Sequence, residues 1–185
     1  AVPLLALAVQ GWLISRGLRV WHRRVAAAGI LMAMGCVTAA VPMIPAMLGS
    51  SRGTGFATWG LRLAFFDTVT LAWFAGLVAV GLANVRRPAL HQRCLLATAS
   101  LALPPGLSRL MARPPVGMDF GWAVHASFWV TDALLLWLWW RDRRAGVEEA
   151  APYLATAVLL LALELVLAPV GDSATWRAIA AVLAP

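Results

Sequence analysis

Lysine is absent from this 185-residue sequence, and charged residues of any kind are scarce. All 15 basic residues are arginine, and charged residues make up 12% of the chain, against about 25% in a typical soluble domain. Without lysine there is no Schiff base to retinal or pyridoxal phosphate, and no phosphate-binding loop that ends in lysine. Hydrophobic residues make up 62% of the chain, which excludes a water-soluble globular domain, a disordered chain and a coiled coil. The sequence is that of an integral membrane protein.

Catalytic motifs are absent as well. The chain has no HExxH, GxSxG or CxxC pattern, so zinc proteases, serine hydrolases and thiol oxidoreductases lack support. Its two cysteines, Cys36 and Cys94, lie in or beside apolar segments without the spacing of metal ligands. We therefore predict no catalytic residues, no metal site and no enzymatic activity.

Apolar segments of bilayer length, about 20 residues each, define the predicted architecture. We expect a single all-α transmembrane domain over residues 1–185, built as a bundle of six transmembrane helices with short loops. Short loops make consecutive helices antiparallel neighbours. The predicted spans are residues 1–15, 25–45, 63–84, 94–112, 122–140 and 154–170.

Prolines and caps refine these boundaries. Pro42 and Pro45 are expected to end the second helix, and the pair Pro104–Pro105 to break or kink the fourth. Asp172 or Ser173 is expected to cap a C-terminal interfacial helix over residues 173–183.

Arginine placement predicts the orientation. Four of the arginines fall between the first two spans, and Arg109 lies inside the fourth. Ten arginines lie in alternate turns, against four that are spread over the opposite side; the ten are Arg16, Arg19, Arg23, Arg24, Arg86, Arg87, Arg93, Arg141, Arg143 and Arg144. The positive-inside rule places these turns in the cytoplasm. We therefore predict a protein of the bacterial inner (cytoplasmic) membrane with both termini in the periplasm.

The net charge of +7 comes from short arginine clusters between apolar segments, a pattern typical of a membrane protein rather than of a nucleic-acid-binding one. The predicted partners are therefore the lipid bilayer and bound lipid, and no nucleic acid.

Ionisable residues inside the apolar segments are the strongest functional candidates, because each costs about 2.5–3.5 kcal/mol to insert unless it is paired. Asp67, Arg109, Asp132 and Glu164 are of this kind. His125 precedes Asp132 by seven positions, which places both on one helix face. Two interpretations remain open. The residues are structural, with an Asp67–Arg109 ion pair between consecutive helices, or all five line a polar pocket that passes protons or holds a small polar ligand.

Three histidines are candidates for binding a haem or chlorin cofactor. His22 and His91 lie at the cytoplasmic ends of their spans, where they can supply two imidazoles to one haem. His125 lies at the other membrane face, about 30 Å away, and can serve only a separate site, with Gly121 one turn earlier leaving space for a flat ring.

Several motifs together resemble an uncharacterised family of bacterial multi-pass inner-membrane proteins. They are Phe66-Asp67, the stretch from His91-Gln92-Arg93 to Ala97-Thr98, Ser108-Arg109-Leu110, His22-Arg23-Arg24 and Thr131-Asp132. The resemblance covers most of the chain. It implies the topology and a set of important positions, namely His22, Asp67, His91, Arg93, Arg109 and Asp132. Cys94 replaces an aliphatic residue of that pattern, and the loop 146–152 lacks its histidine. The family implies no established reaction.

The leading functional hypothesis is a non-enzymatic accessory or scaffold subunit of a larger bioenergetic or transport complex, with other membrane subunits as partners. Very little of the predicted chain lies outside the membrane, and no catalytic constellation is present. Two alternatives come from other classes: a haem- or chlorin-binding redox or pigment protein, and a small transporter or proton conductor.

Overall fold

Every regular element of the part that the structure describes is a helix. The computed structural model describes residues 2–184, and the side chains of residues 9–184. The helices are α1 (Val2–Ser15), α2 (Arg19–Ser51), α3 (Ala57–Ala83), α4 (Pro88–Ser100), α5 (Leu103–Met111), α6 (Phe120–Arg144), the 3₁₀ helix η1 (Glu148–Ala150), α7 (Ala151–Gly171) and α8 (Ala174–Leu183).

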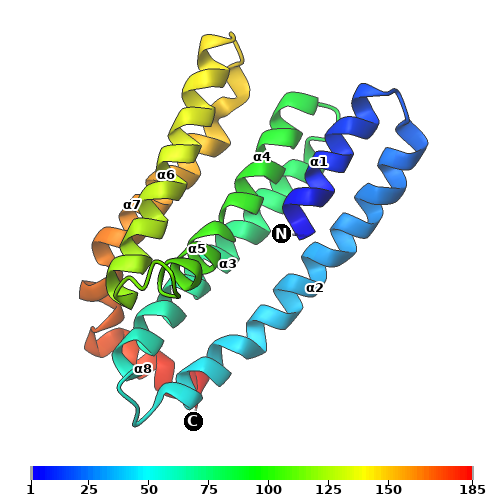
Figure 1. Ribbon diagram of the computed structural model, residues 1–185. Coiled ribbons are helices and arrows are strands. Elements are labelled where there is room, and N and C mark those ends of the chain that lie inside the picture. Colours follow the sequence, from blue (N-terminus) through cyan, green and yellow to red (C-terminus); the bar gives the residue numbers. More distant parts are fainter. Residues whose placement is uncertain (1, 185) are drawn as a thin grey trace.

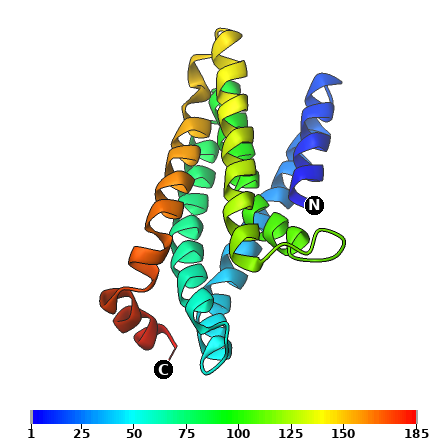
Figure 2. The same cartoon turned by 60° about the vertical axis from the view of Figure 1, so that its left-hand side comes forward.

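The helices form an elongated bundle whose main core joins α3, α4, α6 and α7 (Figures 1 and 2). Buried aromatic and aliphatic side chains fill this core, including Phe66, Phe128, Leu135, Tyr153 and Leu160. The Phe66 and Phe128 rings meet edge to face with their centroids 5.0 Å apart, and Trp73 Nε1 donates a hydrogen bond to Thr156 Oγ1 over 3.0 Å. Helices α1 and α2 form a hairpin along one side of the bundle (Figure 1), and the C-terminal half of α2 packs against α3 and α8 through Ile44 and Leu48.

Four helical segments are long and apolar enough to cross a membrane: α2, α3, the α4–α5 segment Pro88–Met111, and the η1–α7 segment Glu148–Gly171. Six were expected. Helix α1 has 14 residues, which rise about 21 Å, less than the hydrocarbon core of a bilayer. Helix α6 has 25 residues and therefore the length, but its tryptophans, His125 and Asp132 lower its hydropathy. The structure supports a helical membrane protein, and crossings by α1 and α6 remain predictions.

Proline acts differently in the two helices where it was expected to interrupt the backbone. The prediction that Pro42 and Pro45 end the second helix is wrong, because α2 continues through both to Ser51. A proline inside a helix leaves one backbone carbonyl without its N–H partner, whereas ending the helix there leaves several backbone groups without partners. In an apolar environment the second cost is larger, so the helix continues. The break at Pro104–Pro105 is confirmed. Helix α4 ends at Ser100, and the prolines lie in the first turn of α5, where a missing N–H costs nothing.

The loops between helices lie at different levels of the bundle, and the α5–α6 loop at residues 112–119 lies partway along it (Figures 1 and 2). The turns at residues 16–18, 84–87 and 145–147 lie at one end, which we call the basic end (Figures 1 and 2). The loop at residues 52–56 and helix α8 lie at the opposite end. The α8 cap is confirmed as Ser173, whose Oγ accepts a hydrogen bond from the Trp176 N–H over 3.1 Å. The arginine-rich turns assigned to one side by sequence therefore come together in space.

Candidate intramembrane polar site

The interface between α6 and α7 joins two of the predicted site residues directly. His125 Nδ1 lies 3.1 Å from Glu164 Oε1. The Glu164 side chain is only 10% exposed, whereas that of His125 is 37% exposed. Asp119 begins α6 by accepting hydrogen bonds from the Gly121 and Trp122 N–H groups, so His125 lies within the first two turns. The pair thus connects an accessible imidazole to a largely buried carboxyl group.

Asp132 lies two turns further along the same face of α6 and at the middle of that helix. It is 9% exposed, and its Oδ1 atom is buried without a hydrogen-bond partner. The two fully buried hydroxyls nearest in sequence are already used. Ser127 donates to the Val124 carbonyl and Thr131 to the Ser127 carbonyl. Glu164 is close enough to act electrostatically on Asp132, so His125, Glu164 and Asp132 form one group, which we call the α6–α7 cluster.

Asp67 and Arg109 form a second, separate group. Arg109 acts electrostatically on the Asp67 carboxyl group, as expected for two residues at similar depth on consecutive helices. Among the described residues, however, no Asp67–Arg109 ion pair forms within 4 Å. The Arg109 Nη1 atom instead donates to the Pro105 carbonyl over 2.8 Å, one of the acceptors near the break before α5. The structure thus divides the five predicted pocket residues into a group of three and a group of two.

His22 and His91 both lie at the basic end. His91 Nδ1 lies 2.8 Å from the Gly81 carbonyl oxygen. A carbonyl oxygen only accepts, so Nδ1 carries the N–H, and in the neutral ring Nε2 is then the nitrogen with a lone pair. The Nδ1 atom of His22 is buried without a hydrogen-bond partner. Within residues 2–184, no three His, Cys, Asp or Glu side chains gather into a group that can hold a metal ion.

Sequence reasoning missed the most buried ion pair. Arg93 Nε donates to Asp142 Oδ2 over 2.8 Å, and the two side chains are only 12% and 6% exposed. Arg141 adds a second interaction with the same carboxylate at 2.8 Å. The sequence feature that could have indicated this pair is Asp142 itself, a single acid between Arg141 and Arg143 after the fifth predicted span. The resemblance had marked Arg93 as important, without a partner.

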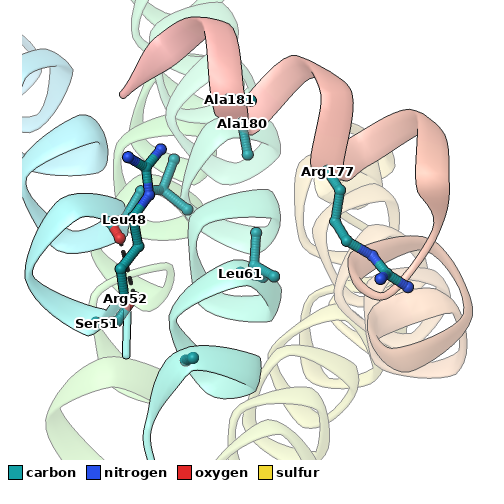
Figure 3. A pocket seen from close by; sticks show the side chains of 8 residues that line it. Leu48, Ser51, Arg52, Leu61, Arg177, Ala180 and Ala181 are labelled. Carbon is teal, nitrogen blue, oxygen red and sulfur yellow. Dashed lines mark hydrogen bonds between the residues drawn. The ribbon is translucent and has the colours of Figure 1, made fainter. Parts of the chain in front are cut away.

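A groove at the end opposite the basic end has a volume of about 190 Å³ and lies between α2, α3 and α8 (Figure 3). Leu48, Leu61 and two alanines of α8 form half of its lining. Arg52 and Arg177 border it but extend in opposite directions (Figure 3). Both guanidinium groups donate to main-chain carbonyls, of Ala184 and Asp172 respectively. The groove is thus mainly apolar, and the hydrogen bonds of its two arginines go to main-chain carbonyls at the ends of α7 and α8.

No family model, curated protein or solved structure matches the chain. The resemblance to a family of multi-pass inner-membrane proteins therefore stays a prediction.

The ion pair between Arg62 and Asp172, at the end opposite the basic end, predicts a dependence of stability on pH. Arg62 Nε donates to Asp172 Oδ1 over 2.9 Å. This hydrogen bond holds the pKa of Asp172 below its ordinary value, against the opposing effect of partial burial. A carboxyl group with a lowered pKa in the folded state stabilises the protein above its unfolded-state pKa, about 4, and loses that contribution as the pH falls through the folded-state value.

We expect Asp172→Asn to lower the thermal unfolding temperature at neutral pH, with the difference from the wild type disappearing below about pH 4. Unfolding in detergent at pH values from 7 to 3 measures this effect. A difference that stays constant over the whole range contradicts the assignment.

Proposed function

We propose that the protein is a non-enzymatic accessory or scaffold subunit of a larger complex in the bacterial inner membrane. In this proposal α1 and α6 join the four apolar segments to give six crossings. The basic end faces the cytoplasm, both termini are periplasmic, and α8 lies in the outer interface. The gathering of arginine-rich turns at one end supports this arrangement.

The observation that carries the proposal is the low burial of α2. In its most apolar 18-residue stretch only 6% of the residues are buried, compared with 22% for α3 and 33% for the η1–α7 segment. Leu31, Met34 and Val41 are each 59–70% exposed on one face of this helix. Gly35 lies on the same face, with no atom within 4 Å of a Cβ built there. We call this surface, defined by Leu31, Met34, Gly35 and Val41, the open face of α2.

Small residues let helices approach closely where lipid offers no hydrophobic driving force between them. Gly35, in the middle of the open face, provides such a point of approach for a helix of another subunit. Lipid can also cover the face, so the test has to separate a helix partner from lipid.

Gly35→Leu is expected to release the protein from its complex without disturbing its own fold. The new side chain enters space that is empty in the isolated chain, but it blocks close approach of a partner helix. Gly76→Leu is the matched control, because Gly76 is an exposed helical glycine on α3 with no atom within 4 Å of a built Cβ. The measurement is the native mass of the protein after gentle solubilisation of its own membranes.

The proposal expects wild type and Gly76→Leu to migrate in a large assembly and Gly35→Leu to migrate as a smaller species. If all three proteins migrate alike as monomers, or if Gly35→Leu stays in the assembly, the open face is covered by lipid and the proposal fails.

Binding of a tetrapyrrole is the second candidate function, and the geometry of His91 favours it. A histidine whose Nδ1–H is held by a backbone carbonyl and whose Nε2 is free has the usual orientation of a metal-ligating imidazole. His22 lies at the same end, and neighbouring arginines suit the propionates of haem. Purified protein with a Soret band that disappears in His91→Ala supports this function. A spectrum without such a band after growth with excess haem contradicts it.

A further inference from the structure

We propose that the α6–α7 cluster is a proton-binding site in which Asp132 holds the proton, and that His125 and Glu164 connect it to the end of the molecule opposite the basic end. The site is independent of the accessory role proposed above. It combines a buried acid without a hydrogen-bond partner at Oδ1, a second acid within electrostatic range of it, and a partly exposed imidazole bonded to that second acid.

The surroundings of Asp132 favour its neutral, protonated form. An ionised carboxylate buried without hydrogen bonds or a counter-ion is costly, and in practice such a group takes up a proton. The hydroxyls of Ser127 and Thr131 donate to carbonyls of their own helix, so neither supplies a hydrogen bond to Oδ1. The neighbouring carboxyl group of Glu164 acts in the same direction, since two adjacent acids do not readily ionise together.

Within residues 9–184, no cation on the packed helices neutralises Asp132. On α4, Arg93 is paired with Asp142. On α5, Arg109 is bonded to the Pro105 carbonyl and acts on Asp67. Glu148 and Glu149 of η1 lie at the basic end, as does Tyr153 at the start of α7. Among the described residues, His125 is therefore the positively chargeable group associated with the cluster.

His125 supplies the route to the surface. Its side chain is 37% exposed, whereas Glu164 is 10% exposed. A proton taken up by the imidazole is passed from Nδ1 to Glu164 Oε1, which lies 3.1 Å away. Glu164 and Asp132 share no direct hydrogen bond, so the last step runs through an intervening water molecule. The Glu164 carboxyl group gives its proton to the water as the water gives one to Asp132, so charge and atoms balance.

The cluster reaches exposed surface at its His125 end. Toward the basic end the α6–α7 interface continues with Leu135 and Leu160, both 0% exposed, and Ala157 at 3%. Asp142, the next acid of α6, lies ten residues beyond Asp132, about 15 Å along the helix. This apolar layer separates Asp132 from the Arg93–Asp142 pair. The structure therefore favours reversible binding from the His125 end over conduction across the bundle.

Infrared spectroscopy of the protein in lipid vesicles tests the proposal without knowledge of any other ligand. The carbonyl stretch of a protonated carboxylic acid is expected in the wild type and should disappear in Asp132→Asn, an isosteric change. Glu148→Gln is the control, because it removes an exposed acid at the basic end and should leave the band unchanged. If the band persists in Asp132→Asn, the assignment of the proton to Asp132 is wrong.

The route has a separate readout in the rate at which deuterium replaces the proton. Exchange is followed by the shift of the same band after transfer to D₂O. His125→Gln should keep the band but slow its exchange about 10²-fold, the scale of a lost acid–base group. Glu164→Gln should slow exchange in the same way. Unchanged exchange in both variants overturns the route through His125 and Glu164.

Discussion

Replacing Asp142 with alanine is expected to destabilise the protein by about 3–5 kcal/mol, the largest effect we predict for any single substitution. Asp142 is 6% exposed and binds Arg93, which is 12% exposed. Removal of the carboxylate leaves a guanidinium buried in the bundle with no opposite charge. Arg93 cannot lose its proton to relieve this cost, because arginine stays protonated in proteins.

A double replacement separates the loss of the pair from the loss of packing. Arg93→Met with Asp142→Leu replaces both charges by apolar side chains, and such replacements are often neutral or stabilising. We expect this double variant to recover most of the stability that Asp142→Ala loses. Arg141→Ala is the matched single control, since its side chain is 51% exposed, and its cost should be under about 1 kcal/mol.

Unfolding in mixed micelles measures these differences. Equal losses for Asp142→Ala and Arg141→Ala would show that the Arg93–Asp142 pair contributes no more than a surface interaction.

Gly171→Ala is expected to cost about 1–3 kcal/mol, the usual range for overpacking. Helix α7 passes so close to α3 at this point that a Cβ on Gly171 would lie 2.9 Å from Arg62 Cγ and 3.0 Å from Arg62 Cα. The second of these is a backbone atom, so a side-chain rotation cannot remove the clash. The expected movement of α3 away from α7 also strains the Arg62–Asp172 ion pair.

Gly76→Ala is expected to have the opposite effect, an increase in the stability of the protein. Gly76 lies inside α3 with open space around its Cα, and replacing a helical glycine with alanine stabilises a helix by about 0.5–1 kcal/mol. Thermal unfolding of both variants measures the difference. Equal shifts in the two proteins would contradict the close α3–α7 contact.

Local signals predicted much of the fold. Apolar length predicted helices at all six segments, the prolines at 104 and 105 predicted the break between α4 and α5, and Ser173 was one of two predicted caps for α8. Pro42 and Pro45 misled the prediction, because water-based rules for proline do not hold where an apolar environment penalises a free backbone more strongly.

The candidate site was predicted in part. The seven-residue spacing placed His125 and Asp132 on one face of α6, and Glu164 was recognised as an intramembrane acid. Their pairing depends on the register between α6 and α7, which a single sequence does not encode in any local pattern. For the same reason the ion pairs Arg93–Asp142 and Arg62–Asp172, separated by 49 and 110 residues, were not predicted.

Cysteine mapping in whole cells tests most directly the claim that the arginine-rich turns lie on one side of the membrane. Single cysteines at Ser15, Val85 and Ala145 mark the basic end, and cysteines at Thr54 and Val116 mark the opposite loops, all in a Cys36→Ala background that leaves every arginine in place. We predict that a membrane-impermeant maleimide labels Thr54→Cys and Val116→Cys in intact cells, and the other three only after permeabilisation. Labelling of Ser15→Cys and Val85→Cys from opposite sides would contradict the account.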